Sequence, residues 1–96
     1  SLNQLMNFVC ENPVKIFGIK NKGYIREGFD ADFTIVDMDK KIIIKNENIE
    51  SKCKWSPFNE VEFKGSPVYT IIAGKIKMQN GKILGEPEGA PLVFEN

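Results

Sequence analysis

The segment VYTIIAGKIKMQNGKIL, residues 68–84, constrains the fold of this 96-residue chain more than any other. Two apolar runs are each closed by a glycine turn, first at Ala73-Gly74 and then at Asn80-Gly81. An Asn-Gly pair between such runs is typical of a type I′ hairpin. We therefore expect strands at 68–73 and 75–78, each followed by a tight turn.

Further strands are expected upstream of these hairpins. DADFTIVDMD favours a strand at about 32–37, and KKIIIK predicts a second strand whose run Ile42–Ile44 is apolar on both faces and therefore covered on both. NENIES forms either one helical turn or an extended link, and the tail GEPEGAPLVF can add an edge strand. A sheet of only three or four strands that is covered on both faces needs a second layer. A partner chain or another part of the same chain would supply that layer.

The first 18 residues are expected to be helical. Because the residue before a proline disfavours helical geometry, we expect a break at Asn12, with a second short helix starting at Pro13 and ending at Gly18. The expected organisation is a helical segment at 1–18 and a β-rich segment at 19–96. The first helix has one apolar face, formed by Leu2, Leu5, Met6 and Val9.

Composition narrows the classes of partner. Thirteen basic residues balance thirteen acidic ones, which argues against nucleic acid as a partner. No apolar run approaches the roughly 20 residues that span a bilayer, and no signal-peptide pattern opens the chain, so we expect a soluble cytoplasmic protein without a membrane partner. The two cysteines, Cys10 and Cys53, are expected to be free thiols, buried or half-buried.

The chain contains no histidine, so the commonest general base and metal ligand is absent. The acid pairs Asp30/Asp32 and Asp37/Asp39 have the spacing that puts both carboxylates on one face of a strand. They form either a cation site or, as we favour, polar punctuation at the two ends of a strand. Cys53 lacks an identifiable base and is interpreted as a structural thiol.

The cluster Trp55, Pro57 and Phe58 is interpreted as a packing plug under a loop rather than as a ligand platform. Four glycines are assigned to turns, because their spacing does not match a phosphate-binding loop; they are Gly65, Gly74, Gly81 and Gly85. We therefore expect no catalytic, cofactor-binding or metal-binding residue in this chain.

Two stretches resemble a known family. NPVKIFGIKNKGYIREGFDADFTIVD, residues 12–37, resembles the segment that follows the catalytic barrel in the amidohydrolase superfamily, with departures at Val14 and Phe29. SKCKWSPF, residues 51–58, resembles a signature near the C-terminus of dihydroorotases, as does the following GSPVYTII. Lys54 replaces a common glycine there, and the usual glycine after the Phe is absent.

This resemblance implies the C-terminal part of a dihydroorotase, which interconverts N-carbamoyl-L-aspartate and dihydroorotate in pyrimidine biosynthesis. Its zinc ligands lie in a (β/α)8 barrel upstream of the matching segment, so zinc is expected in the parent enzyme and not in this chain, which alone is expected to be inactive. The implied fold is mainly β with short N-terminal helices: the C-terminal part of a small β-sandwich, with the barrel absent. The implied partner is the rest of the dihydroorotase, its barrel and N-terminal strands.

Two alternatives to a dihydroorotase segment remain. The first is the tail of a hydantoinase or dihydropyrimidinase, and the second is a stand-alone, non-catalytic β-rich interaction module. SKCKWSPF argues against the first alternative, and the apolar run Ile42–Ile44 argues against the second. We further expect that the isolated chain covers its open strands by self-association.

Overall fold

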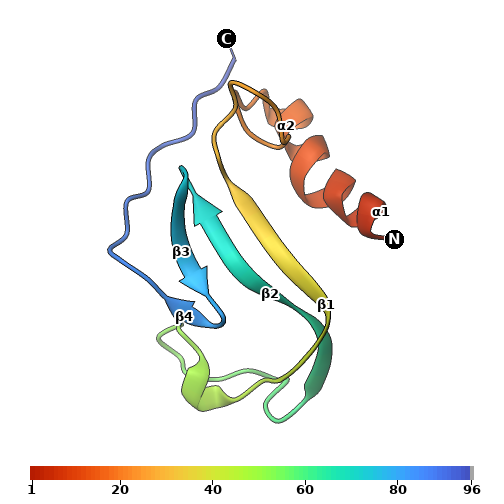
Figure 1. Ribbon diagram of the computed structural model, residues 1–96, viewed down its shortest axis with the longest axis vertical. Coiled ribbons are helices and arrows are strands. Elements are labelled where there is room, and N and C mark those ends of the chain that lie inside the picture. The colour runs from red at the N-terminus through yellow and green to blue at the C-terminus, as the bar shows by residue number, and fades with distance from the viewer. Residues whose placement is uncertain (96) are drawn as a thin grey trace.

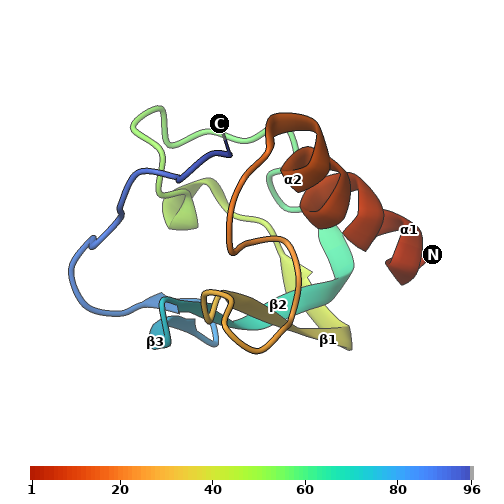
Figure 2. The same cartoon turned by 90° about the horizontal axis from the view of Figure 1, so that it is seen from above.

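The computed structural model describes residues 1–95. Four strands form one antiparallel sheet in the order β1-β2-β3-β4, so that each strand pairs with its neighbour in the chain (Figure 1). The N-terminal helices lie on one side of this sheet (Figure 2). No helix in residues 1–95 is long and apolar enough to cross a membrane. The elements are α1 (Leu2–Met6), the π-helical turn η1 (Asn7–Glu11), α2 (Asn12–Phe17), β1 (Phe33–Ile43), the 3₁₀ turn η2 (Asn46–Asn48), β2 (Glu62–Ile72), β3 (Lys75–Gln79) and β4 (Lys82–Ile83).

The two central strands are longer than the sequence predicted. The separate strands expected at 32–37 and around Ile42–Ile44 are one strand, β1, and β2 begins at Glu62 instead of residue 68. Between Asp37 and Lys41 the pairing shifts, because four steps along β1 match two along β2. Such a bulge absorbs extra residues without ending the strand.

A glycine and a proline inside β2 explain why its first half was missed. Gly65 has φ +92° and lies against the carbonyl of Met38, and Pro67 lies beside a second register shift, between Pro67 and Tyr69. Proline and glycine are tolerated in a sheet at bulges, where the regular hydrogen-bond ladder is interrupted. The sequence signals for a break therefore mark irregular pairing inside a strand.

Both predicted hairpin turns are confirmed. Ala73 and Gly74 have φ of 51° and 78°, and Asn80 and Gly81 have φ of 48° and 85°. A type I′ turn requires positive φ at both central residues, which is why glycine occupies the second position in each turn. Residues 46–48 form the helical turn that was one of the two alternatives. The four glycines assigned to turns all have positive φ, although Gly65 lies in a bulge; the others are Gly74, Gly81 and Gly85.

The C-terminal tail does not form the edge strand that was considered. It makes a single bridge, between Ile19 and Phe94, flanked by hydrogen bonds from Lys20 N–H to the Val93 carbonyl (2.8 Å) and from Glu95 N–H to the Gly18 carbonyl (2.7 Å). The prolines of the tail cannot donate to a ladder, which limits pairing. The tail therefore runs as an extended segment from β4 to the end of α2 (Figure 1).

The predicted helix break at Asn12 is wrong. Asn12 has helical φ and ψ of −64° and −45°, and its N–H donates to the carbonyl of Asn7, five residues back. In a regular α-helix the ring of Pro13 would clash with the carbonyl of Val9. The wider π-helical turn accommodates the proline, so the helix continues to its confirmed C-cap at Gly18.

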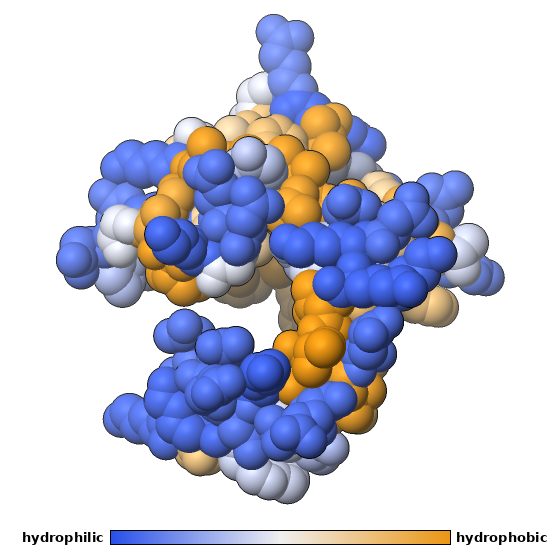
Figure 3. Space-filling view, turned by 60° about the horizontal axis from the view of Figure 1, so that its bottom comes forward, coloured by the Kyte–Doolittle hydropathy of each residue, from blue (hydrophilic) through white to orange (hydrophobic). Residues whose placement is uncertain are grey.

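The described chain has no closed hydrophobic core. No apolar side chain of residues 1–95 is buried, and the only buried polar side chain among them belongs to Ser66. The accessible surface is 7959 Å², whereas a folded monomer of this mass exposes about 5,600 Å². The radius of gyration is 15.4 Å, against about 12.5 Å for a compact domain of this length. Apolar surface lies open between polar parts of the molecule (Figure 3).

Both faces of the sheet expose apolar side chains. The register places Ile35, Ile71 and Ile76 on one face, and Ile72 and Ile83 on the opposite face. The prediction that the run Ile42–Ile44 is covered on both faces is not met within residues 1–95, since Ile43 is 52% exposed. The sheet therefore has the apolar character of a central layer without its covering layers.

Candidate functional site

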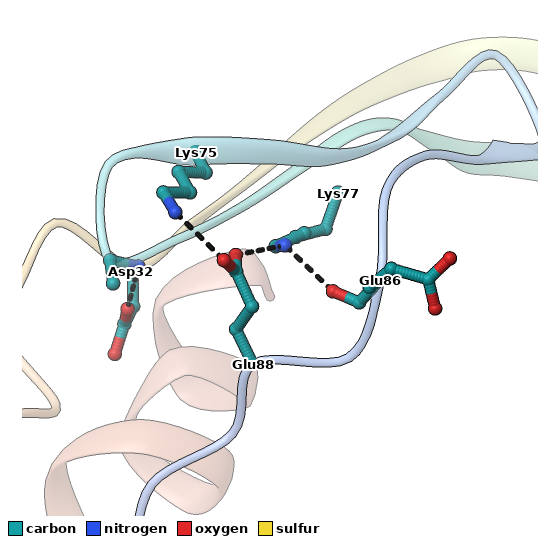
Figure 4. A network of polar contacts seen from close by, with 6 residues as sticks. Asp32, Lys75, Lys77, Glu86 and Glu88 are labelled. Atoms are coloured by element: carbon teal, nitrogen blue, oxygen red, sulfur yellow. Dashed lines mark hydrogen bonds and ion pairs between the residues drawn. The ribbon is translucent and has the colours of Figure 1, made fainter.

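The first acid pair binds a lysine of the same loop. Lys22 Nζ lies 2.9 Å from Asp30 Oδ2 and 2.6 Å from Asp32 Oδ2. Asp32 also accepts a hydrogen bond from the Ala73 N–H at 2.8 Å (Figure 4). The hydrogen bond from Lys22 is the main cause that lowers the pKa of Asp32, and the hydrogen bond from the Ala73 N–H is the second. In turn, the hydrogen bonds to Asp32 and Asp30 raise the pKa of Lys22. The pair thus ties the loop before β1 to the turn between β2 and β3.

The second acid pair lies in the bulge of β1, not at the end of a strand as the sequence predicted. Asp37 Oδ1 accepts the N–H of Asp39 at 3.0 Å, and Asp39 Oδ1 lies 3.6 Å from Lys64 Nζ. The carboxylate of Asp39 is open to solvent. Among residues 1–95, no three His, Cys, Asp or Glu side chains come together as a metal-binding group.

Both cysteines are free thiols, as predicted, but their environments differ. Cys10 is half-buried on the helical segment, whereas Cys53 is exposed, so the expected burial is wrong for Cys53. The Sγ of Cys53 lies 3.3 Å from the hydroxyl oxygen of Ser51. A hydrogen bond from this hydroxyl lowers the pKa of the Cys53 thiol.

We expect Cys53 to react with Ellman's reagent at least about tenfold faster than Cys10 at neutral pH, since thiolate content and access set the rate. The Cys53→Ser and Cys10→Ser variants assign the two kinetic phases. Because the difference arises from folding, it should vanish in concentrated urea. Equal rates for the two thiols in the native chain would contradict the exposed position of Cys53.

Trp55 and Phe58 do not form the packing plug that was predicted, because they are 62% and 54% exposed. They project from residues 49–60, which we call the signature loop. The Phe58 ring contacts Phe63 at the start of β2 edge to face, with centroids 5.7 Å apart. Trp55, Pro57 and Phe58 do not line either of the two surface hollows that are described in the next two paragraphs.

Two asparagines that the sequence analysis missed close the base of this loop. The Asn46 N–H donates to Asn59 Oδ1 at 2.8 Å, and Asn46 Oδ1 accepts the N–H of Ser56 at 2.9 Å. The N–H of Glu60 donates to the Ile44 carbonyl at 2.6 Å. A polar hollow of about 320 Å³ opens beside this base, lined by Lys45, Asn46, Glu47, Asn59 and Glu60.

A second polar cluster attaches the tail to β3 (Figure 4). Lys75 Nζ lies 2.9 Å from Glu88 Oε1, and Lys77 contacts the other oxygen of Glu88 and, at 3.0 Å, the carbonyl of Glu86. Hydrogen bonds from Lys77 and Lys75 lower the pKa of Glu88 to about 2. A hollow of about 440 Å³ separates the tail from the sheet, with Ile72 and Ile83 in its wall.

The described polar groups are mostly engaged with one another. Each described acid cluster is engaged by a lysine or by a backbone N–H, and the exposed thiol of Cys53 has a hydroxyl neighbour instead of a base. The exposed aromatic side chains include Trp55 and Phe58 of the signature loop, and Phe8 and Phe17 of the helical segment. These groups are suited to contact with an apolar surface.

Comparison with known proteins places these features in a family. The model of the Amidohydrolase family matches residues 1–77. The dihydroorotase of Pyrococcus furiosus is 45% identical over 93 residues, which cover 97% of this chain and 22% of that protein. The dihydroorotase of Methanothermobacter thermautotrophicus is 38% identical over 84 residues, covering 88% of this chain and 20% of that protein.

A solved structure supports the same relationship. The L-hydantoinase (dihydropyrimidinase) from Arthrobacter aurescens superposes with a TM-score of 0.84 at 37% identity, covering 90% of this chain and 19% of that one. This chain spans about a fifth of the length of these relatives. Its sheet and N-terminal helices match the corresponding part of amidohydrolase-fold proteins, and residues 1–95 contain no barrel. The chain belongs to the amidohydrolase family.

Proposed function

We propose that this chain forms the C-terminal, non-catalytic part of a dihydroorotase, a cytoplasmic enzyme that interconverts N-carbamoyl-L-aspartate and dihydroorotate in pyrimidine biosynthesis. The observation that carries the proposal is the 45% identity to a dihydroorotase over 97% of the chain. The resemblance of residues 51–58 to the dihydroorotase signature supports the same choice.

The partner in this proposal is the catalytic part of the same enzyme. The chain exposes about 2,400 Å² more than a compact monomer of its mass. A standard protein interface buries only about 800 Å² on each partner. The excess accessible area is therefore large enough for the apolar faces of the sheet and helices to form an interface with a catalytic domain and its neighbouring strands.

Zinc, in this proposal, belongs to the catalytic part. The chain contains no histidine, and the described acid clusters are engaged by lysines or backbone N–H groups, so they do not fit a zinc site. When bound in the catalytic part, zinc would activate a water molecule for attack on the cyclic amide. The residues of this chain would support that part only by packing and by positioning its last helix.

The second candidate is the tail of a hydantoinase, and the superposition on the Arthrobacter L-hydantoinase favours it. Two chimeras separate the candidates. In one, this chain replaces the 93 matching residues of the Pyrococcus furiosus dihydroorotase; in the other, it replaces the matching part of the L-hydantoinase. Both leave the scaffold's own catalytic residues untouched.

We expect the dihydroorotase chimera to hydrolyse dihydroorotate within about tenfold of its parent, a change of about 1.4 kcal/mol in activation free energy. Relative to its own parent, the hydantoinase chimera should show a larger decrease in melting temperature and in activity than the dihydroorotase chimera does. The isolated chain should show no turnover of dihydroorotate, with or without added zinc. An inactive, unfolded dihydroorotase chimera, or turnover by the repurified isolated chain, would contradict the proposal.

A further inference from the structure

We propose that the signature loop is an anchor that inserts the Trp55 side chain into an apolar slot on the catalytic part of the dihydroorotase. This inference rests on the proposed function and adds which side chain holds the two parts together. The observation behind it is a large aromatic side chain, 62% exposed, on a loop whose conformation is already fixed.

The loop is fixed at its base. The backbone N–H of Asn46 donates to the Asn59 side chain, and the side-chain oxygen of Asn46 accepts the N–H of Ser56. The hydrogen bond from the Glu60 N–H to the Ile44 carbonyl then ties the last residue of the loop to the residue that follows β1. Compact surface loops with adjoining ends and internal packing are frequently functional.

The interior of the loop is also satisfied. Lys54, at a positive φ of 52°, donates from its side chain to the carbonyl of Ile49 at 2.8 Å. The N–H of Phe58 donates to the Ser56 hydroxyl at 3.1 Å. With these polar groups paired, the Trp55 side chain still remains 62% exposed. A preorganised loop loses little conformational entropy when it binds.

The occupant is a protein surface. The ammonium of Lys54 is engaged inside the loop and the chain is neutral overall, which does not fit a nucleic-acid platform. Neither hollow of about 320 Å³ or 440 Å³ includes Trp55, which does not fit a small-molecule pocket. Tryptophan is by contrast enriched among the residues that dominate protein interfaces.

The occupant is the catalytic part in particular, for two reasons. The relatives that match 97% or 88% of this chain are more than four times longer, so the remaining four-fifths of such an enzyme offers the surface that would meet it. The excess accessible area of about 2,400 Å² exceeds what a standard interface takes from one partner. The slot should offer apolar walls and one acceptor for the indole N–H.

The test uses the dihydroorotase chimera and the fact that Trp55 is the only tryptophan of this chain. Intein ligation introduces 5-fluorotryptophan in this segment alone, so that one ¹⁹F resonance reports on Trp55. We expect a large H₂O/D₂O isotope shift and strong broadening by a soluble paramagnetic agent in the dilute isolated chain. In the folded chimera both effects should fall at least about fivefold, as for a fully desolvated interface residue.

A substitution pair adds an energetic readout. Trp55→Ala should lower the melting temperature of the chimera by roughly 2–4 °C, because a given loss of stability shifts the melting temperature of a whole enzyme less than that of a small domain. The matched control is Lys52→Ala, because Lys52 lies in the same loop and its side chain makes no hydrogen bond or ion pair within residues 1–95. This control should leave the melting temperature within about 1 °C.

The outcomes separate the two proposals. An active chimera in which Trp55 stays accessible, or in which Trp55→Ala behaves like Lys52→Ala, overturns the anchor and leaves the proposed function intact. A chimera that does not fold contradicts the proposed function, and the anchor falls with it. Protection of Trp55 in the isolated chain, increasing with concentration, would show a second copy as the occupant and would also overturn the anchor.

Discussion

Replacing Gly23 by alanine is expected to destabilise the chain by about 2–5 kcal/mol. Gly23 has φ +87°, and a Cβ there would lie 2.5 Å from Val14 Cγ2 and 3.0 Å from the Cys10 carbonyl oxygen. The left-handed backbone costs an alanine about 1–2 kcal/mol, and overpacking adds about 1–3 kcal/mol. Gly23 is thus the point where the loop after α2 runs directly against the helix.

Gly28→Ala is the matched control for this prediction. Its φ of +85° is nearly the same, but a Cβ there would meet nothing within 4 Å. Only the backbone cost of about 1–2 kcal/mol should therefore appear. Urea unfolding followed by circular dichroism, at one fixed protein concentration, measures both variants. Equal losses would show that the loop does not pack on the helix as described.

The isolated chain is expected to sediment as a dimer or larger species at micromolar concentration. It leaves apolar side chains open on both sheet faces, and the outer edge of the 11-residue strand β1 has no neighbour in the described chain. Long open edges with apolar side chains pair with other chains, with or without exchange of strands. Sedimentation velocity over a range of concentrations gives the result directly.

A charge on the open sheet face should reverse this association. Ile35→Lys places an ammonium on a 46% exposed position of β1, and it should shift the chain toward monomer. Ile25→Lys makes the same charge change on the 80% exposed Ile25 of the loop before β1, and it should have little effect. A compact wild-type monomer with a cooperative melt at micromolar concentration would rule out self-association through these surfaces.

The hairpins and the family were accessible from the sequence because their signals are local. A type I′ turn depends on two adjacent residues, as at Asn80-Gly81, and family motifs such as residues 12–37 are contiguous. The helix through Asn12 was missed because a proline rule describes regular helices. The π-helical turn that accommodates Pro13 depends on the surrounding turns of helix.

The remaining errors concern features that join distant residues. The length of β2 depends on bulges in its pairing with β1, and Gly65 and Pro67 alone do not distinguish a bulge from the end of a strand. The hydrogen bond from the Asn46 N–H to the Asn59 side chain joins residues 13 apart in the sequence, so it becomes visible only when η2 and the loop are placed together. Ile43 and Trp55 were predicted to be covered because they are apolar, but within residues 1–95 both are more than half exposed; in our proposal the catalytic part of the enzyme would cover them.

The order of the sheet has a consequence for the speed of assembly. Since each strand pairs with the one before it, the sheet can form by successive local steps without a search across the whole chain. In the proposed enzyme, the sheet would then meet the catalytic part as a preformed surface, avoiding the ordering cost of a segment that folds on binding. Because both parts would belong to one chain, their docking would be an intramolecular step whose rate does not depend on protein concentration. That step should therefore be limited by the orientation of the two parts, with strand formation already complete.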